Sequence, residues 1–483
     1  AYEILIGLVG SEMCIRDMVY TMPEFLERRY NPQSRTILSV ISLVSYVLTK
    51  VAVTVYAGGL VFQQVFGIKE LWGIDFFWIA AIGLVVLTAL YTIFGGMKSV
   101  LYTSVLQTPI LLLGSLIILV LGFKELGGWD EMMRVCGAVT VNDYGDTMTN
   151  LIRSNDDANF PWLGALIGSA IIGFWYWCTD QFIVQRVLSG KNEMEARRGT
   201  IFGAYLKLLP VFLFLIPGMI AFALHQKYIG AGGEGFLPML ANGTANADAA
   251  FPTLVAKLLP AGVKGLVVCG ILAALMSSLA SLFNSSAMLF TIDFYKRFKP
   301  ETPEKKLVGI GQIATIVIVV LGILWIPIMR SVGDVLYTYL QDVQSVLAPG
   351  IAAAFLLGIC WKRTSAQGGM WGLISGMVIG LTRLGAKVYY SNAGEVADST
   401  FKYLFYDMNW LFFCGWMFLF CIIVVIVVSL ATEAPTAEKI QGLVFGTATK
   451  EQKAATRASW NHWDIIHTVI ILAITAAFYW YFW

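Results

Sequence analysis

The chain has 483 residues, of which 58% are hydrophobic and 13% are charged, and its formal net charge is +2. Soluble domains usually carry about 25% charged residues, so this composition indicates a polytopic protein embedded in a lipid bilayer. The small net charge gives no basis for a nucleic-acid partner.

Cysteine and histidine usage argues against several kinds of chemistry. The seven cysteines have neither a disulfide pattern nor metal-ligand spacing, and we expect no bound cofactor. The three histidines, His225, His462 and His467, lie at or beyond the ends of predicted helices. Because the membrane interior then lacks the usual general base, we do not expect an enzyme.

Apolar stretches long enough to cross a bilayer recur along the chain, and about 20 apolar residues suffice for one crossing. Eleven stretches qualify: 36–62, 76–94, 101–123, 162–187, 201–224, 265–290, 308–328, 335–361, 371–390, 403–429 and 465–483. Lys and Arg are concentrated in alternate connections, such as 186–198 and 296–306, which the positive-inside rule assigns to the cytoplasm. The other connections face outward, and we expect the longest, 226–264, to cover an outer vestibule.

Residues 1–19 do not fit this pattern. They place Ser11, Glu12, Arg16 and Asp17 where an apolar span would continue. The segment has neither the basic start nor the cleavage site of a signal peptide. We expect a truncated chain in which 1–19 is a damaged helix remnant, and residues 7–17 (GLVGSEMCIRD) resemble translated sequencing-adapter readthrough.

The span 162–187 has a polar centre. Its residues 171–186 read IIGFWYWCTDQFIVQR, with Asp180 and Gln181 among amphipathic aromatic residues. A lipid-facing helix leaves such groups without water partners, so we expect this helix to border a wet cavity or to end early. The alternative is that Asp180 and Gln181 lie at the cytoplasmic end of the span. The sequence assigns no role to Asp180.

The segment 273–286 (AALMSSLASLFNSS) repeats serine at helical spacing. Ser277, Ser281 and Ser285 occur at every fourth position and Ser278 lies one step round, so the hydroxyls form a stripe. Hydroxyls and backbone carbonyls at an unwound helix supply the neutral oxygens that a dehydrated Na⁺ needs. The alternative is close helix packing, with hydroxyls bonded to carbonyls four residues earlier.

Three further polar residues lie inside predicted spans. Lys50 is near the middle of its span, whereas Lys207 is near a cytoplasmic end, where it can snorkel to the interface. Gln341 shares a helix face with Tyr337, and packing between helices is the alternative reading. Amides, charged groups and aromatic faces are what a hydroxyl-rich solute requires. No phosphate-binding glycine loop is present, which favours an ion gradient over ATP as the energy source.

Five motifs carry a resemblance to a known family: YTMPEFLERRY (20–30), WYWCTDQFIVQR (175–186), YLKLLPVF (205–212), SSLASLFNSS (277–286) and IAAAFLLGICWKR (351–363). From about residue 18 to the end, the chain resembles the sodium/solute symporters, in the sodium–glucose cotransporter branch. The resemblance implies an all-α, LeuT-like core of five-plus-five inverted repeats. It divides the chain into 1–19 (remnant of the second core helix), 36–123 (core helices 3–5), 161–361 (core helices 6–10) and 368–483 (three peripheral helices). The first core helix is then missing.

The resemblance also implies site residues. Ala274, through its carbonyl, with Ser277 and Ser278 correspond to Na⁺ ligands. The substrate-binding positions are Glu3, Lys50, Trp177, Lys207 and Gln341, and the gates are Tyr2, Tyr176 and Tyr337. Tyr176 is the inner gate, and Tyr2 and Tyr337 are outer ones. Ser104 stands where the family usually has an acid associated with sodium exit.

The function expected from these features is Na⁺-coupled import of a glucose- or galactose-like sugar by alternating access. Na⁺ is then the coupling ion, and the sugar, Na⁺ and the lipid bilayer are the partners, with the oligomeric state left open. The expected location is a bacterial inner membrane. Two alternatives are a symporter for another polyol such as myo-inositol, and a sensor or channel that keeps the fold without coupled transport, to which Ser104 points.

Overall fold

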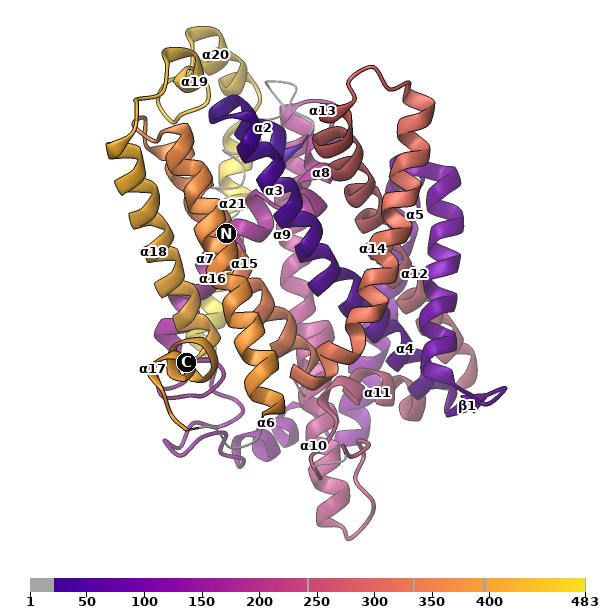
Figure 1. The fold of residues 1–483 in the computed structure, drawn as a ribbon. Coiled ribbons are helices and arrows are strands. Elements are labelled where there is room, and N and C mark those ends of the chain that lie inside the picture. The colour runs from indigo at the N-terminus through magenta and orange to yellow at the C-terminus, as the bar shows by residue number, and fades with distance from the viewer. Residues whose placement is uncertain (1–20, 241–242, 333–334, 394–396, 483) are drawn as a thin grey trace.

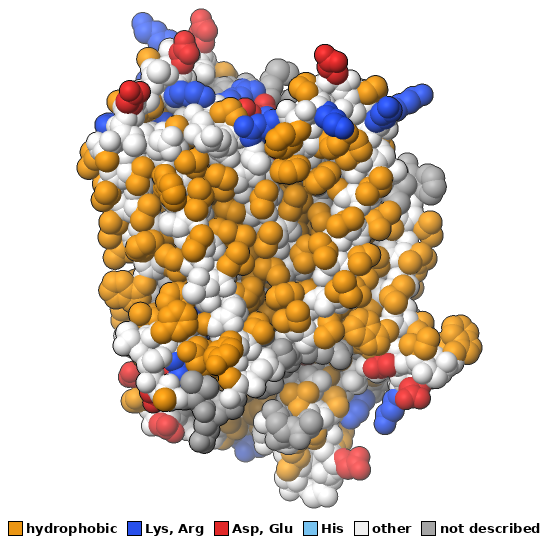
Figure 2. Space-filling model, in the orientation of Figure 1, with side chains coloured by type: hydrophobic (Ala, Val, Ile, Leu, Met, Phe, Trp, Pro, Cys, Tyr) orange, Lys and Arg blue, Asp and Glu red, His pale blue; other side chains and the backbone are white. Residues whose placement is uncertain are grey.

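The computed structural model describes residues 21–240, 243–332, 335–393 and 397–482. Most of them form long helices that run side by side along one direction (Figure 1). Two short strands, β1 (Glu70–Leu71) and β2 (Ile74–Asp75), pair antiparallel with Leu71 opposite Ile74. Figure 2 shows a broad hydrophobic band between two ends that carry the charged side chains. This distribution is the one that a bilayer imposes on an integral membrane protein.

The first helices are α2 (Met22–Arg29), α3 (Pro32–Ser45), the π-helix η1 (Tyr46–Val51), α4 (Ala52–Phe66), α5 (Phe76–Leu126) and α6 (Trp129–Gly137). The side chains of Thr21 and Asn31 cap α2 and α3, each with proline in the first turn. Together α3, η1 and α4 form the predicted first span, and Gly67 ends it with a left-handed φ of 66°.

The helix α5 covers both of the predicted spans 76–94 and 101–123. It is a continuous helical element of 51 residues, longer than two bilayer crossings of about 20 residues each. The strand β1 before α5 and the helix α6 after it lie at the same end of the bundle (Figure 1), as two crossings by the predicted spans require.

The middle of the chain begins with α7 (Trp162–Cys178), α8 (Gln181–Leu188), α9 (Glu193–Pro210), η2 (Val211–Leu215) and α10 (Ile216–Gly230). It continues through η3 (Ala247–Ala249), α11 (Ala250–Leu258), α12 (Ala261–Met288), η4 (Leu289–Tyr295), α13 (Lys296–Phe298), α14 (Glu304–Val332) and α15 (Leu336–Cys360). The predicted span 162–187 is the pair α7 and α8, bent by 46° at its break. The predicted outward loop 226–264 contains η3 and α11, and Asp248 accepts the backbone N–H of Leu336 at the start of α15.

The C-terminal elements are α16 (Ala366–Asn392), α17 (Thr400–Lys402), η5 (Tyr403–Asp407), α18 (Trp410–Ala431), α19 (Ala437–Ile440), α20 (Lys450–Ala458) and α21 (His462–Tyr481). The predicted span 403–429 starts later than expected, because Asn409 caps a new helix by accepting the N–H of Leu411. Gly350 and Gly376 let the backbones of α15 and α16 touch, since a Cβ at either position would meet the other glycine.

All eleven predicted spans coincide with helices. Within the described ranges, eight helices are long and apolar enough to cross a membrane, or nine with the bent pair α7–α8 counted as one. The remaining two predictions correspond to the shorter apolar stretch Phe76–Leu90 and to α16. Connections predicted to be cytoplasmic, including α13, α19 and α20, lie at one end of the bundle, and α6, α11 and β1 lie at the other (Figure 1).

Candidate functional site

The polar centre of the predicted span 162–187 marks the place where α7 stops. The hydroxyl of Thr179 donates a hydrogen bond to the carbonyl of Trp175 at 2.8 Å. The carboxylate of Asp180 caps α8 by accepting a hydrogen bond from the N–H of Phe182 at 3.2 Å. The helix therefore ends early, as expected. Asp180 is 4% exposed and precedes the eight residues of α8, so protein encloses its carboxylate, and its depth in the bilayer stays a prediction.

Asp180 forms a buried ion pair with Lys50. The ammonium of Lys50 contacts Oδ2 of Asp180, and Tyr46 donates its hydroxyl to Oδ1 at 3.1 Å. The Lys50 nitrogen also lies 4.3 Å from the ring centroid of Phe182 and 5.5 Å from that of Tyr176. Lys50 sits in the π-helix η1, a distortion that is frequent at functional sites. The intramembrane cation thus has a carboxylate and aromatic faces around it.

Four of the predicted site residues gather around the end of α7. The rings of Tyr176 and Trp177 meet edge to face at 5.2 Å, and Tyr176 faces Lys50. On the other side, the ammonium of Lys207 lies 4.0 Å from the ring centroid of Trp177. Lys207 is exposed on α9, so its charge stays accessible while its position is fixed by the indole.

The serine stripe of α12 divides into two kinds of serine. The hydroxyls of Ser281 and Ser285 donate to the carbonyls of Ser277 and Ser281, at 3.0 and 2.9 Å. Bonds to carbonyls four residues earlier are what the alternative of close helix packing predicts. The hydroxyl of Ser277 instead lies 2.6 Å from that of Ser104 on α5. Ser278, one step round, is half-buried, as is Ala274 one turn earlier. The predicted ligand position Ser277 is therefore adjacent to Ser104.

The broken helix and the serine helix are joined by side-chain hydrogen bonds that the sequence reasoning missed. Gln185 donates to the carbonyl of Ser281 at 3.0 Å and accepts from the amide of Asn284 at 3.1 Å. Arg186 donates to the hydroxyl of Ser281 at 2.5 Å. Their motif, WYWCTDQFIVQR, was singled out, but the partners lie almost a hundred residues away, so no local signal identifies them. These bonds tie α8 to α12.

Tyr337 and Gln341 form a separate pair in the first turns of α15. The amide of Gln341 donates to the Tyr337 hydroxyl at 3.3 Å, and Tyr337 is 56% exposed. This agrees with the shared helix face read from the sequence. Tyr2 and Glu3 fall outside the described residues.

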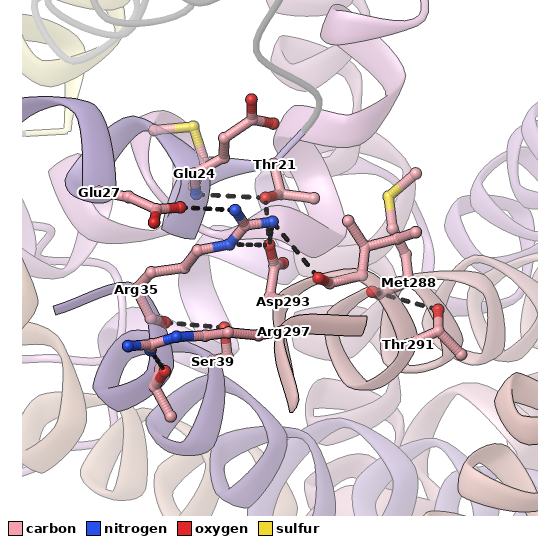
Figure 3. A network of polar contacts seen from close by, with 12 residues as sticks. Thr21, Glu24, Glu27, Arg35, Ser39, Met288, Thr291, Asp293 and Arg297 are labelled. Carbon is pink, nitrogen blue, oxygen red and sulfur yellow. Dashed lines mark hydrogen bonds and ion pairs between the residues drawn. The ribbon is translucent and has the colours of Figure 1, made fainter. Parts of the chain in front are cut away.

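A second polar network ties α2 and α3 to η4 at the end of the bundle that carries α13 (Figure 3). Asp293, fully buried, accepts from the hydroxyl of Thr21 at 2.9 Å and from Nε of Arg35 at 2.7 Å. Arg35 also donates to Glu27 at 2.6 Å, so one guanidinium bridges two carboxylates. The bridge holds the N-terminal helix hairpin against the end of the serine helix.

Asp293→Asn is expected to lower the free energy of unfolding by about 1.5–3 kcal/mol, because a buried charge-assisted hydrogen bond to Arg35 is lost. The midpoint of thermal unfolding of the purified protein in detergent measures this. Glu131→Gln is the control, because its partner Arg134 is 70% exposed and water screens such a pair so that it adds little to stability. Equal midpoints for the two variants would contradict the role given to Asp293.

Comparison with known proteins places these features in a family. The family model described as the Sodium:solute symporter family matches residues 1–376. The sodium/mannose cotransporter SLC5A10 of Bos taurus is 35% identical, over 96% of this chain and 80% of its own length. The sodium/myo-inositol cotransporter 2 of Homo sapiens (35%) and the sodium/glucose cotransporter 1 of Ovis aries (36%) align over 92% and 89% of this chain. The chain spans 66% of the length of each of these two relatives.

Among solved structures, the chain is similar to a Na⁺-coupled sialic acid symporter in a substrate-bound outward-open state. The TM-score is 0.64 at 21% identity, over 90% of this chain and 84% of that one. This likeness concerns the fold, and it confirms the expected all-α, LeuT-like architecture. The motifs, the fold and the family match agree: the chain belongs to the sodium:solute symporter family.

Proposed function

We propose that this protein is a Na⁺-coupled secondary symporter that imports a glucose-like sugar by alternating access. The observation that carries the proposal is the hydrogen-bonded connection between two groups of residues. The serine stripe of α12 offers cation ligands, and the cluster at the end of α7 offers ligands for a hydroxylated solute. The helix α8 contacts the stripe through Gln185 and the cluster through Phe182, whose ring faces Lys50. The sodium/mannose and sodium/glucose cotransporters named above support this choice of cargo.

For Na⁺ we assign the carbonyl of Ala274 and the hydroxyls of Ser277 and Ser278. These are hard, neutral oxygens on one helix, and the Ser277 hydroxyl already has a second hydroxyl, that of Ser104, at 2.6 Å. Binding of Na⁺ at this point shifts the equilibrium between outward- and inward-open states by as much as its affinity differs between them.

For the sugar we assign Trp177, Lys207, Lys50 and Gln341, with Glu3 outside the described residues. The Trp177 face suits the C–H surface of a sugar ring, and Lys207 and Gln341 donate to hydroxyls. Lys50 has three N–H donors, and its contact with Asp180 leaves capacity for a solute or water. Tyr176 is the inner gate in this scheme, and Tyr337 and Tyr2 are outer gates.

A polyol such as myo-inositol is the second candidate cargo. It shares the hydroxylated ring of a sugar, and the sodium/myo-inositol cotransporter 2 is as similar to this chain as the sugar cotransporters are. The location in a bacterial inner membrane belongs to the proposal and rests on the sequence reading, since the relatives named above come from animals.

The test is uptake of labelled glucose, mannose or myo-inositol into proteoliposomes containing the full-length protein, with Na⁺ or K⁺ outside. We expect uptake in Na⁺ to exceed uptake in K⁺ by about tenfold or more, because the ion gradient supplies the driving force. Competition among the three solutes then identifies the cargo. Equal uptake in the two salts would refute coupling, and uptake of none of them would favour a sensor or a different substrate.

A further inference from the structure

A second group of buried charges lies beside Gln341, on a side of α15 that the transport scheme above does not use. Asp342 is buried, and its Oδ2 lies 2.5 Å from the ammonium of Lys387 on α16. Its Oδ1 lies 3.6 Å from Nη2 of Arg383, one turn before Lys387. Two cations thus face one carboxylate, within a pair of helices whose backbones touch at Gly350 and Gly376.

Arg383 is held mainly by other groups. Its side chain is fully buried, it donates to the carbonyls of Met408 at 2.7 Å and Leu404 at 3.3 Å, and its guanidinium lies 4.0 Å from the ring centroid of Phe413. The arginine is therefore anchored to the segment before α18, and Lys387 is the close partner of Asp342. The peripheral helices α16 and α18 in this way fix the position of Asp342 on α15.

A second fixed point on α15 is Tyr339. Its hydroxyl donates to the carbonyl of Leu48 at 3.0 Å and accepts from the indole of Trp325 at 2.6 Å. Leu48 belongs to η1, the element that carries Lys50. At roughly 100° per residue, Tyr339 and Asp342 lie close together on the helix surface, and Tyr337 and Gln341 lie together on a different side. Because Tyr339 and Asp342 hold one side of α15 in place, they also fix the direction in which Tyr337 and Gln341 point.

We propose that Asp342, clamped by Lys387 and Arg383, is a positioning residue for substrate recognition. By fixing the rotation of the outer half of α15, it aims Gln341 and Tyr337 at the solute path. The inference rests on the proposed function, because it takes the role of Gln341 from there. Removing the charge of Asp342 leaves Lys387 and Arg383 facing each other, and their repulsion turns or shifts the start of α15.

The first test compares uptake kinetics of Asp342→Asn, Lys387→Met, the double variant and Lys387→Arg. For Asp342→Asn we expect the sugar KM to rise about tenfold, the cost of one misplaced hydrogen bond, with the half-saturating Na⁺ concentration unchanged. The double variant should recover part of this loss, because it removes one of the two repelling cations, and Lys387→Arg should behave like the parent protein. The control is Asp398→Asn, whose carboxylate is 95% exposed and pairs with Lys402 on the same side of the membrane.

A merely structural role for Asp342 predicts fewer folded molecules, hence a lower maximal rate at an unchanged KM, and that result would overturn the proposal. A second measurement does not depend on transport. Tyr337→Cys is labelled with a membrane-impermeant maleimide, with and without Asp342→Asn, and the rate is corrected for the native cysteines. We expect the labelling rate to change severalfold. Absence of uptake by the parent protein would count against the proposed function alone, whereas an unchanged labelling rate would overturn the positioning role.

Discussion

Asp180→Asn is expected to lower the free energy of unfolding by about 3–5 kcal/mol and to abolish solute uptake, because it strands the buried ammonium of Lys50. Both side chains are almost completely inaccessible, with 8% of Lys50 and 2% of Asp180 exposed. Asparagine isolates the effect of charge. Its amide oxygen can still cap α8 at Phe182 and still accept from the hydroxyl of Tyr46.

The control for this prediction is the double variant Lys50→Met/Asp180→Asn. With both charges gone, no unpaired ion stays in the membrane interior, so most of the stability should return. Uptake should not return, because Lys50 belongs to the proposed solute site. Denaturation in detergent and uptake into proteoliposomes measure the two effects separately. A single variant as stable as the double one would show that Lys50 has another adequate partner.

Ser278→Ala is expected to raise the half-saturating Na⁺ concentration for uptake, because it removes one of the oxygens assigned to the cation. Loss of a ligand hydroxyl in a dehydrated site costs about 1–3 kcal/mol, equivalent to about 5–150-fold in the half-saturating Na⁺ concentration. The matched control is Ser285→Ala on the same helix. The Ser285 hydroxyl is bonded to the carbonyl of Ser281 and is not among the oxygens assigned to Na⁺. Unchanged Na⁺ dependence in Ser278→Ala would remove this residue from the site.

The reciprocal change at this site is Ser104→Asp, which introduces the acid that the resemblance implies at this position. Its carboxylate would enter within hydrogen-bond reach of Ser277, given the present spacing of 2.6 Å between the two hydroxyls. At about 4 Å and an effective dielectric constant of about 20, a unit charge pair attracts by about 4 kcal/mol, and desolvation offsets part of this. We therefore expect a lower half-saturating Na⁺ concentration. A higher value would show that Ser104 lies outside the cation path.

The positions of the helices were predictable from the sequence because crossing a bilayer is a local requirement. Each span needs its own run of apolar residues, so 36–62 or 308–328 can be identified without knowing any neighbour. The predictions were wrong where a local device changes the backbone. Asn409 delays the start of α18. Capping and turn residues act over a few positions. They can therefore move the end of a helix away from the position that hydropathy alone predicts.

The site was predictable only in part. The polar centre at Asp180 and the cation at Lys50 were visible as expensive residues inside apolar runs, but each lacked a partner. Their pairing joins helices 130 residues apart, and the contact between Ser104 and Ser277 joins positions 173 apart. The same holds for Asp342, whose partner Lys387 lies 45 residues further along the chain.

What the sequence by itself determined is the membrane location, the course of the spans and the family, whereas an early helix end at Asp180 was one of several readings that it left open. Only the tertiary structure decided which buried charges form ion pairs. It also decided which serine of the stripe bonds to another helix and not to a carbonyl of its own helix. The physical reason is that a buried ion or hydroxyl must be satisfied somewhere, which composition reveals, whereas the group that satisfies it depends on how helices distant in sequence pack together.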